Sequence, residues 1–247
     1  MNKIRTTCLG SGDAFSSGGR HQSGYFIESP ESAMLLDCGS TVLSSLKSRR
    51  ISIAAADLVF ISHLHGDHFG GLPFLFLHYL YIEPRVRPLV IAGSPGTESR
   101  ARAMFELTYA DTAAEPLPFD LKFIDALPGK AIEFKDFRIV PFPVPHQMEP
   151  LSLGCEIFAG DRKIVYSGDS GWTEDLPIHT QDADLFLCEC MFFDSRNASH
   201  LDYRRIRENL HRFGAKRIVL THLGQEMLEH EQEVELEMAE DGMILEF

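Results

Sequence analysis

The residues best suited to chemistry form one short cluster of metal-binding types. Three imidazoles and one carboxylate occur within six residues, in the order His63-Leu-His65-Gly-Asp67-His68. Such a group is a ligand set for a borderline-soft divalent cation. The cluster follows the apolar run 57–61 and is followed by Gly70 and Gly71. Because a regular helix or strand would scatter these side chains, we expect a loop at a strand end that turns them inward together.

Further ligands for such a site have to come from distant parts of the chain, because six residues give one ion at most two or three ligands. Three candidates each follow an apolar, strand-like run: His146 after 139–144, Asp169 after 164–168, and His222 after 218–221. Ligands collect at the carboxyl ends of strands in open α/β sheets. His146 or His222 alone is more often structural, but the repeated pattern favours a metal site.

The elements that would position these residues are short apolar runs of the β type, with helices between some of them. The expected strands are residues 4–9, 24–28, 34–36, 58–61, 89–92, 122–125, 137–144, 154–158, 163–166, 185–188, 217–220 and 243–246. The expected helices are residues 41–48, 72–81, 98–109 and 203–213. This pattern predicts a mixed α/β fold. Because no linker or repeat interrupts the chain, we expect a single domain over residues 1–247.

Composition excludes several classes of protein. With 247 residues, 44% of them hydrophobic, the chain can bury a large core, which excludes disorder and a disulfide-stapled miniprotein. The formal net charge of −13 gives an overall field that does not attract phosphate backbones or anionic lipids. The five scattered cysteines are expected to be buried, reduced thiols. Neither a signal peptide nor a membrane span is recognisable, so a cytoplasmic location is the default expectation.

Two segments raise the question of partners. The segment from Leu72 to Ile82 is apolar almost all round. A helix of that kind is normally buried on several sides, so burial inside the domain is the simpler expectation. The alternative is a homodimer whose contact is formed by this segment. The stretch from Glu226 to Asp241 is rich in acids and is expected to be a solvated face or loop.

The order HxHxDH, His, Asp, His along the chain resembles the metallo-β-lactamase superfamily. The resemblance extends from Leu9-Gly-Ser-Gly12 and Leu36-Asp-Cys-Gly39 to the final segment 241–246. It implies a four-layer αβ/βα sandwich with a binuclear metal site at one edge. Within the superfamily, several motifs are similar to the tRNase Z-like (ribonuclease Z) phosphodiesterases. They are 60–68 followed by Gly71-Leu-Pro73, Ser167-Gly-Asp-Ser170, and Cys188-Glu-Cys190 followed by Ser199-His-Leu201.

Carried over to this sequence, the resemblance implies seven metal ligands. It puts His63, His65 and His146 on one ion and Asp67, His68 and His222 on the second, with Asp169 bridging. Zinc is the expected metal, and Mn or Fe fits the same ligand types. Two ions roughly 3.5–4 Å apart lower the pKa of a shared water and neutralise phosphoryl oxygens. The implied activity is hydrolysis of a phosphodiester by a metal-bound hydroxide.

The metal ions supply no proton for the leaving alkoxide. Here the resemblance points to His200 as the general acid and to Glu189 as the carboxylate that orients it, and Asp67 is counted with them as catalytic. The alternative for Glu189 is a charge at a strand end paired with an arginine. Asp37 is expected to hold a metal-ligand histidine in place rather than to bind metal.

Two features depart from tRNase Z enzymes. Those enzymes carry a long arm that grips the tRNA elbow between the positions matching His146 and Asp169, which lie only 23 positions apart here. The segment 223–227 also lacks the basic and aromatic residues of an RNA-facing loop. We therefore expect a small or cyclic phosphodiester or nucleotide as substrate, with no membrane partner. The alternatives are tRNA 3′-end processing, hydrolysis of a thioester or lactone, and metal binding without turnover.

Overall fold

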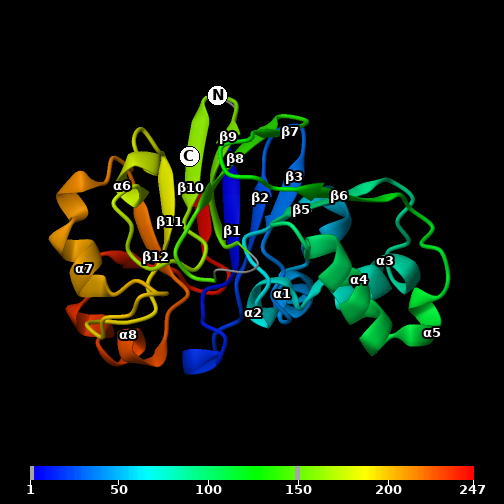
Figure 1. Ribbon diagram of the computed structural model, residues 1–247, viewed down its shortest axis with the longest axis horizontal. Helices are drawn as coiled ribbons and strands as arrows, with labels where there is room; N and C mark the ends of the chain where they lie inside the picture. Colours follow the sequence, from blue (N-terminus) through cyan, green and yellow to red (C-terminus); the bar gives the residue numbers. More distant parts are fainter. Residues whose placement is uncertain (1–2, 148–150) are drawn as a thin grey trace.

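Two seven-stranded sheets form the centre of the molecule, and helices cover their outer faces (Figure 1). The computed structural model describes residues 3–147 and 151–247. Along the first sheet the strands are β14 (Ile244–Glu246), β1 (Arg5–Gly10), β2 (Gly24–Glu28), β3 (Ala33–Leu36), β4 (Ala56–Ile61), β5 (Leu89–Gly93) and β6 (Leu121–Asp125). Along the second they are β13 (Glu237–Met238), β12 (Ile218–Thr221), β11 (Leu185–Glu189), β10 (Arg162–Tyr166), β9 (Leu153–Ala159), β8 (Phe137–Pro143) and β7 (Ile132–Phe134).

The helices fall into two groups, one for each sheet. On the first sheet lie α1 (Val42–Ser48), α2 (Gly66–Phe69), α3 (Leu72–Tyr81), α4 (Thr97–Thr108) and α5 (Ala110–Ala113). On the second lie α6 (Leu176–His179), α7 (Tyr203–Glu208) and α8 (Gln225–Glu229). Strands β3 to β6 pair in parallel, and so do β10 to β13. Parallel strands need covering layers on both faces, which these helices and the opposite sheet provide.

Alternating side chains build three apolar layers. In β4, Leu58 and Phe60 belong to the core between the two sheets, whereas Val59 and Ile61 belong to the core shared with α1, α3 and α4. A third core lies between the second sheet and helices α6, α7 and α8. This two-residue alternation, buried on both faces, is what a strand inside a sandwich requires. The expected four-layer αβ/βα sandwich is therefore confirmed.

The expected strands are all present, with ends that differ by at most two residues. Strands β7 and β13 were not expected, because three and two residues are too short to show a pattern. The helices expected at 41–48, 72–81 and 98–109 are confirmed. The short helices α5 and α6 were missed.

Two expectations about local structure were wrong. The helix expected over 203–213 ends at Glu208 and continues as a separate 3₁₀ turn, because Asn209 leaves helical geometry and its side-chain amide donates to the carbonyl of Arg205. Asp67 and His68 lie on the short helix α2 rather than on a loop. The acidic stretch from Glu226 to Asp241 is a solvated face, as expected: none of its acids is buried, although it includes most of α8 and all of β13.

The apolar segment from Leu72 to Ile82 is only partly buried. Leu75 and Tyr79 point into the core beneath α3, whereas Tyr81 and Ile82 are about two-thirds exposed, at 66% and 63%. All five cysteines are buried and free, as expected. Among the described residues, no helix is long and apolar enough to cross a membrane.

Candidate metal centre

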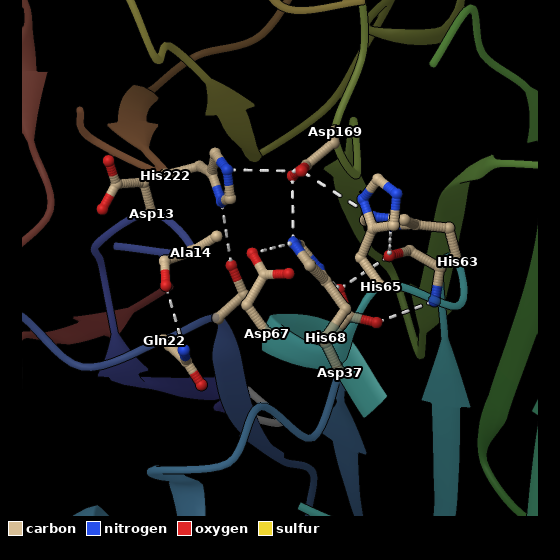
Figure 2. Close-up of polar contacts among 12 residues, drawn as sticks. Asp13, Ala14, Gln22, Asp37, His63, His65, Asp67, His68, Asp169 and His222 are labelled. Carbon is tan, nitrogen blue, oxygen red and sulfur yellow. Dashed lines mark hydrogen bonds and ion pairs between the residues drawn. The ribbon is translucent and has the colours of Figure 1, made fainter. Parts of the chain in front are cut away.

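The seven candidate metal ligands singled out from the sequence meet at one edge of the two sheets. From the first sheet, His63 and His65 follow β4, and Asp67 and His68 stand on α2. From the second sheet, His146, Asp169 and His222 follow β8, β10 and β12. Because the carboxyl ends of these strands open toward the same edge, side chains far apart in sequence come together. Figure 2 shows Asp169 facing His222 on one side and His68 below it.

Asp169 stands between two groups of potential ligands. Each group, His63, His65, His146 and Asp169 or Asp67, His68, Asp169 and His222, has ligand atoms within 4.8 Å of one another. Asp169 Oδ1 lies 3.2 Å from His68 Nε2. Its Oδ2 lies 3.3 Å from His222 Nε2 and 3.7 Å from His63 Nε2. One carboxylate therefore touches both groups.

Among the residues that the structure describes, several buried polar atoms at the centre have no hydrogen-bond partner. They are His63 Nε2, His68 Nε2 and Asp169 Oδ1. Burying such atoms unpaired costs free energy, so native proteins rarely leave them without a ligand. Imidazole nitrogens and a carboxylate oxygen aimed at one small region are the donor set that divalent transition metals prefer. The residues present therefore fit a metal ion in each group.

Burial and neighbouring charges keep most of these side chains in the protonation state that binds metal. Burial lowers the pKa values of His63, His65 and His222, so their imidazoles stay neutral, which is the form that binds metal. Burial alone would raise the pKa of Asp169, but His222 and His68 lower it well below its usual range. His68 is the exception, because three carboxylates raise its pKa despite burial. A cation at that position would compete with the proton on His68.

Asp37 holds His68 in place, as the sequence predicted. Its Oδ2 accepts hydrogen bonds from His68 Nδ1 at 2.7 Å, from the Ser62 hydroxyl at 2.7 Å and from the Tyr166 hydroxyl at 2.8 Å. Its Oδ1 accepts from the backbone N–H of Ser62 at 2.7 Å. With Nδ1 occupied in this way, His68 presents Nε2 to the site. The left-handed backbone at Asp37, with φ of +57°, turns the carboxylate inward at the end of β3.

Two other histidines are oriented through contacts that the sequence did not reveal. His146 Nδ1 donates to the carbonyl oxygen of Ser199 at 2.8 Å, and His222 Nδ1 lies 3.3 Å from the Ser23 hydroxyl. Ser23 and Ser199 are distant in sequence from the histidines they contact, so no local signal could have identified them. His222 itself has φ of +54°, a conformation that stores strain and turns its ring toward Asp169.

The partly buried His200 and the fully buried Glu189 form a pair beside this centre. Glu189 Oε1 accepts from His200 Nδ1, and Oε2 accepts from the backbone N–H of Leu201 at 2.7 Å. The ring of His200 stacks on His222, with centroids 5.7 Å apart, and lies edge-on to His146 at 4.7 Å. Burial raises the pKa of Glu189, and Asp169 raises it further, whereas burial lowers the pKa of His200. The side chain of Glu189 contacts this histidine rather than an arginine.

Comparison with known proteins supports the resemblance inferred from the sequence. A family model described as Anti-Pycsar protein Apyc1 matches residues 4–244. A ribonuclease Z from Ignicoccus hospitalis is 26% identical over 90% of this chain and 88% of that protein.

Solved structures share the fold over essentially the whole chain. The metallo-β-lactamase fold protein YhfI from Bacillus subtilis superimposes with a TM-score of 0.81 and 24% identity, covering 100% of both chains. The short form of human tRNase Z superimposes with a TM-score of 0.79 and 25% identity, covering 98% of both chains. The tRNase Z-like branch of the metallo-β-lactamase superfamily, expected from the motifs, is therefore confirmed.

Proposed function

The chain belongs to the Anti-Pycsar protein Apyc1 family and is a metal-dependent hydrolase of the metallo-β-lactamase superfamily, and on that premise we propose that it cleaves small or cyclic phosphodiesters or nucleotides. The observation that carries the proposal is the convergence of seven side chains of metal-binding types with the His200–Glu189 pair beside them. Both sheets contribute to this site, which supports the further proposal that residues 1–247 act as one domain.

We propose that the site binds two ions. His63, His65 and His146 would hold one, Asp67, His68 and His222 would hold the other, and Asp169 would contact both. Zinc is the proposed metal, since imidazole and carboxylate suit it, and Mn or Fe fits the same ligands. When bound, such ions act as Lewis acids and activate water for attack on phosphorus.

The protein's own contribution to the reaction is to place and move protons. Because Glu189 occupies Nδ1 of His200, Nε2 is the ring nitrogen left to face the leaving oxygen, and in the imidazolium form of His200, paired with the Glu189 carboxylate, Nε2 would donate its proton there and leave a neutral imidazole. Leu201 fixes the second oxygen of Glu189, so the carboxylate cannot turn away from the imidazole. We therefore propose His200 as the general acid and Glu189 as its positioning partner. We also propose Asp67 as a catalytic residue, because it belongs to the proposed metal-binding group with His68, Asp169 and His222.

A small substrate is favoured by the segment in which tRNase Z enzymes carry their tRNA-binding arm. Between His146 and Asp169, the described residues form the antiparallel pair β9 and β10, whose register runs from Ala159 opposite Arg162 to Cys155 opposite Tyr166. These strands belong to the second sheet and leave little chain for an arm. The formal charge of −13 likewise does not favour a polyanion.

A substrate panel tests this proposal. Protein reconstituted with Zn²⁺ or Mn²⁺ would be assayed on a cyclic mononucleotide, on bis-p-nitrophenyl phosphate and on a thioester, with Asp169→Asn as the inactive control. We expect hydrolysis of both phosphodiesters and none of the thioester. A faster reaction with the thioester than with either phosphodiester would contradict the proposed chemistry.

Processing of tRNA 3′ ends is the second candidate, because the Ignicoccus hospitalis relative is named ribonuclease Z. It predicts cleavage of a precursor tRNA with a 3′ trailer at physiological salt. Cleavage of that precursor together with failure on cyclic and other small diesters would favour this candidate over ours.

We also propose that the segment from Leu72 to Ile82 forms a homodimer contact. Phe74, Tyr81 and Ile82 are exposed, and with Leu43 and Leu77 they line an apolar groove between α1 and α3. Single charged substitutions at exposed Tyr81 or Phe74 should convert a dimer into a monomer in light-scattering chromatography. A monomeric wild-type protein at micromolar concentration would refute the contact.

A further inference from the structure

The metal centre is assembled from two separate sheets, so its geometry depends on how those sheets sit relative to each other. Asp67 and His68 come from the first sheet, and Asp169 and His222 from the second. Between the sheets lies a core of apolar side chains. Apolar packing is non-directional and by itself tolerates small displacements. Holding four ligand atoms within 4.8 Å across such an interface requires directional contacts as well.

Two buried tyrosines supply directional contacts across this core. Tyr25 and Tyr166 are the tyrosines of the inter-sheet core in the part of the chain that the structure describes. Their exposed fractions are 0% and 2%, and their rings pack with centroids 5.4 Å apart. Tyr25 belongs to β2 in the first sheet, and Tyr166 belongs to β10 in the second.

Each tyrosine reaches the opposite sheet at a point next to a proposed ligand. The hydroxyl of Tyr25 hydrogen-bonds the hydroxyl of Thr221, the last residue of β12, and His222 follows directly. The hydroxyl of Tyr166 donates to Asp37 Oδ2, the same oxygen that accepts from His68 Nδ1. Tyr25 thus reaches from the first sheet to the second, and Tyr166 reaches from the second sheet to the first. The two contacts end beside His222 and His68, which belong to the same ligand group.

The hydroxyls, rather than the rings, of the two tyrosines distinguish one arrangement of the sheets from another. Phenylalanine would fill the same apolar space, but a buried hydroxyl without a partner is costly, so each tyrosine stabilises only arrangements that satisfy its hydrogen bond. Burial raises the pKa of both phenols well above the usual value, so both keep their protons. A sliding movement of one sheet past the other would break both bonds together.

We propose that Tyr25 and Tyr166 are positioning residues that lock the two sheets in the register required by the group Asp67, His68, Asp169 and His222. The inference rests on the proposed metal binding by this group. It predicts that loss of the two hydroxyls weakens chiefly the Asp67, His68, Asp169 and His222 site, because the two contacts end beside His68 and His222. The His63, His65 and His146 site, which also spans the two sheets and shares Asp169, should weaken less.

The test is Zn²⁺ affinity, measured by competition with a chromophoric chelator, in Tyr25→Phe, Tyr166→Phe and the double variant. Each single variant should weaken one of the two sites by about 10-fold, at the lower end of what loss of an outer hydrogen-bond partner costs. Tyr79→Phe is the matched control, because this buried tyrosine donates to the carbonyl of Ile53 at 3.0 Å on the outer side of the first sheet. It should lose stability without a change in Zn²⁺ affinity.

Thr221→Val provides a second route to the same answer if a tyrosine variant folds poorly. It removes the partner of Tyr25, so it should weaken the same site, and its effect should be non-additive with that of Tyr25→Phe. Wild-type protein that binds two ions, together with unchanged affinity in all these variants, would overturn the inference alone. Wild-type protein that binds no ions would overturn the proposed function, and with it the inference.

Discussion

Replacing His200 by alanine should slow the cleavage of phosphodiesters with alkoxide leaving groups far more than the cleavage of those with p-nitrophenolate. An alkoxide is strongly basic and needs a proton as it departs, whereas p-nitrophenolate leaves readily without one. General acids contribute about 10²- to 10⁴-fold, which corresponds to about 3–5 kcal/mol of transition-state stabilisation. His200→Ala should therefore lose about that much kcat/KM on a cyclic mononucleotide and clearly less on bis-p-nitrophenyl phosphate.

Glu189→Gln should give an intermediate loss on the cyclic mononucleotide. Glu189 accepts one hydrogen bond on each oxygen, from His200 and from Leu201. Glutamine has a single acceptor oxygen, so one of those N–H groups would face the amide NH₂ group. Leaving a buried donor unpaired costs about 1–3 kcal/mol, which should appear as lost stability and as a poorly oriented His200.

The assay compares kcat/KM for the two substrates in wild type, His200→Ala and Glu189→Gln, with metal content measured on each sample. Metal content should be unchanged in both variants, because neither residue is among the proposed ligands. Equal losses on the two substrates would refute a proton-donating role and indicate a role in binding instead. Unchanged rates on both would remove His200 from the mechanism.

Three further predictions concern the scaffold of the site and its surroundings. Asp37→Asn leaves fewer acceptors for the four hydrogen bonds that the carboxylate receives, so metal affinity should fall about 10- to 100-fold in a chelator titration, and an unchanged affinity would show that His68 is held in place by other contacts. Gly168→Ala should destabilise the fold by about 1–3 kcal/mol in denaturant unfolding, because Gly168 has φ of +60° and a Cβ there would lie 2.6 Å from the Leu153 carbonyl oxygen. Burial alone would raise the pKa of Asp57, but hydrogen bonds from Lys135 and Arg85 lower this pKa below its ordinary value of 3.8. The ionised carboxylate therefore stabilises the fold at pH values above 3.8, and this stabilisation is lost as pH falls through the lowered pKa. Asp57→Asn should therefore cost about 2 kcal/mol at pH 7 and much less in strong acid, and an equal cost at both pH values would contradict this linkage.

The strands of the site and the ligand positions at their ends could be predicted from the sequence, because the patterns that mark them are local. The proposed ligands come after four apolar runs, and strands β4, β8, β10 and β12 end within two residues of where those runs end. The strand periodicity also located Asp37 at the end of β3, from which it reaches His68. What the sequence could not show was that Asp67 and His68 sit on α2, because four residues are too few for a helical pattern.

The contacts that orient the site depend on long-range packing and left no local signal. Tyr166 reaches Asp37 over 129 positions in sequence, and Ser23 lies 199 positions from its partner His222. Tyr25 and Tyr166 read in the sequence as ordinary core aromatics on short strands. In the folded structure the two sheets face each other, and this arrangement places both hydroxyls beside ligands of the same group.

Metal content combined with anomalous X-ray scattering shows whether the seven candidate ligands bind two metal ions. Protein loaded with Zn²⁺ and freed of excess ion should contain two ions per chain by elemental analysis. One anomalous peak should lie among His63, His65 and His146, and the other among Asp67, His68 and His222, with Asp169 contacting both. Protein that contains no zinc after reconstitution, or peaks located away from these residues, would contradict the account.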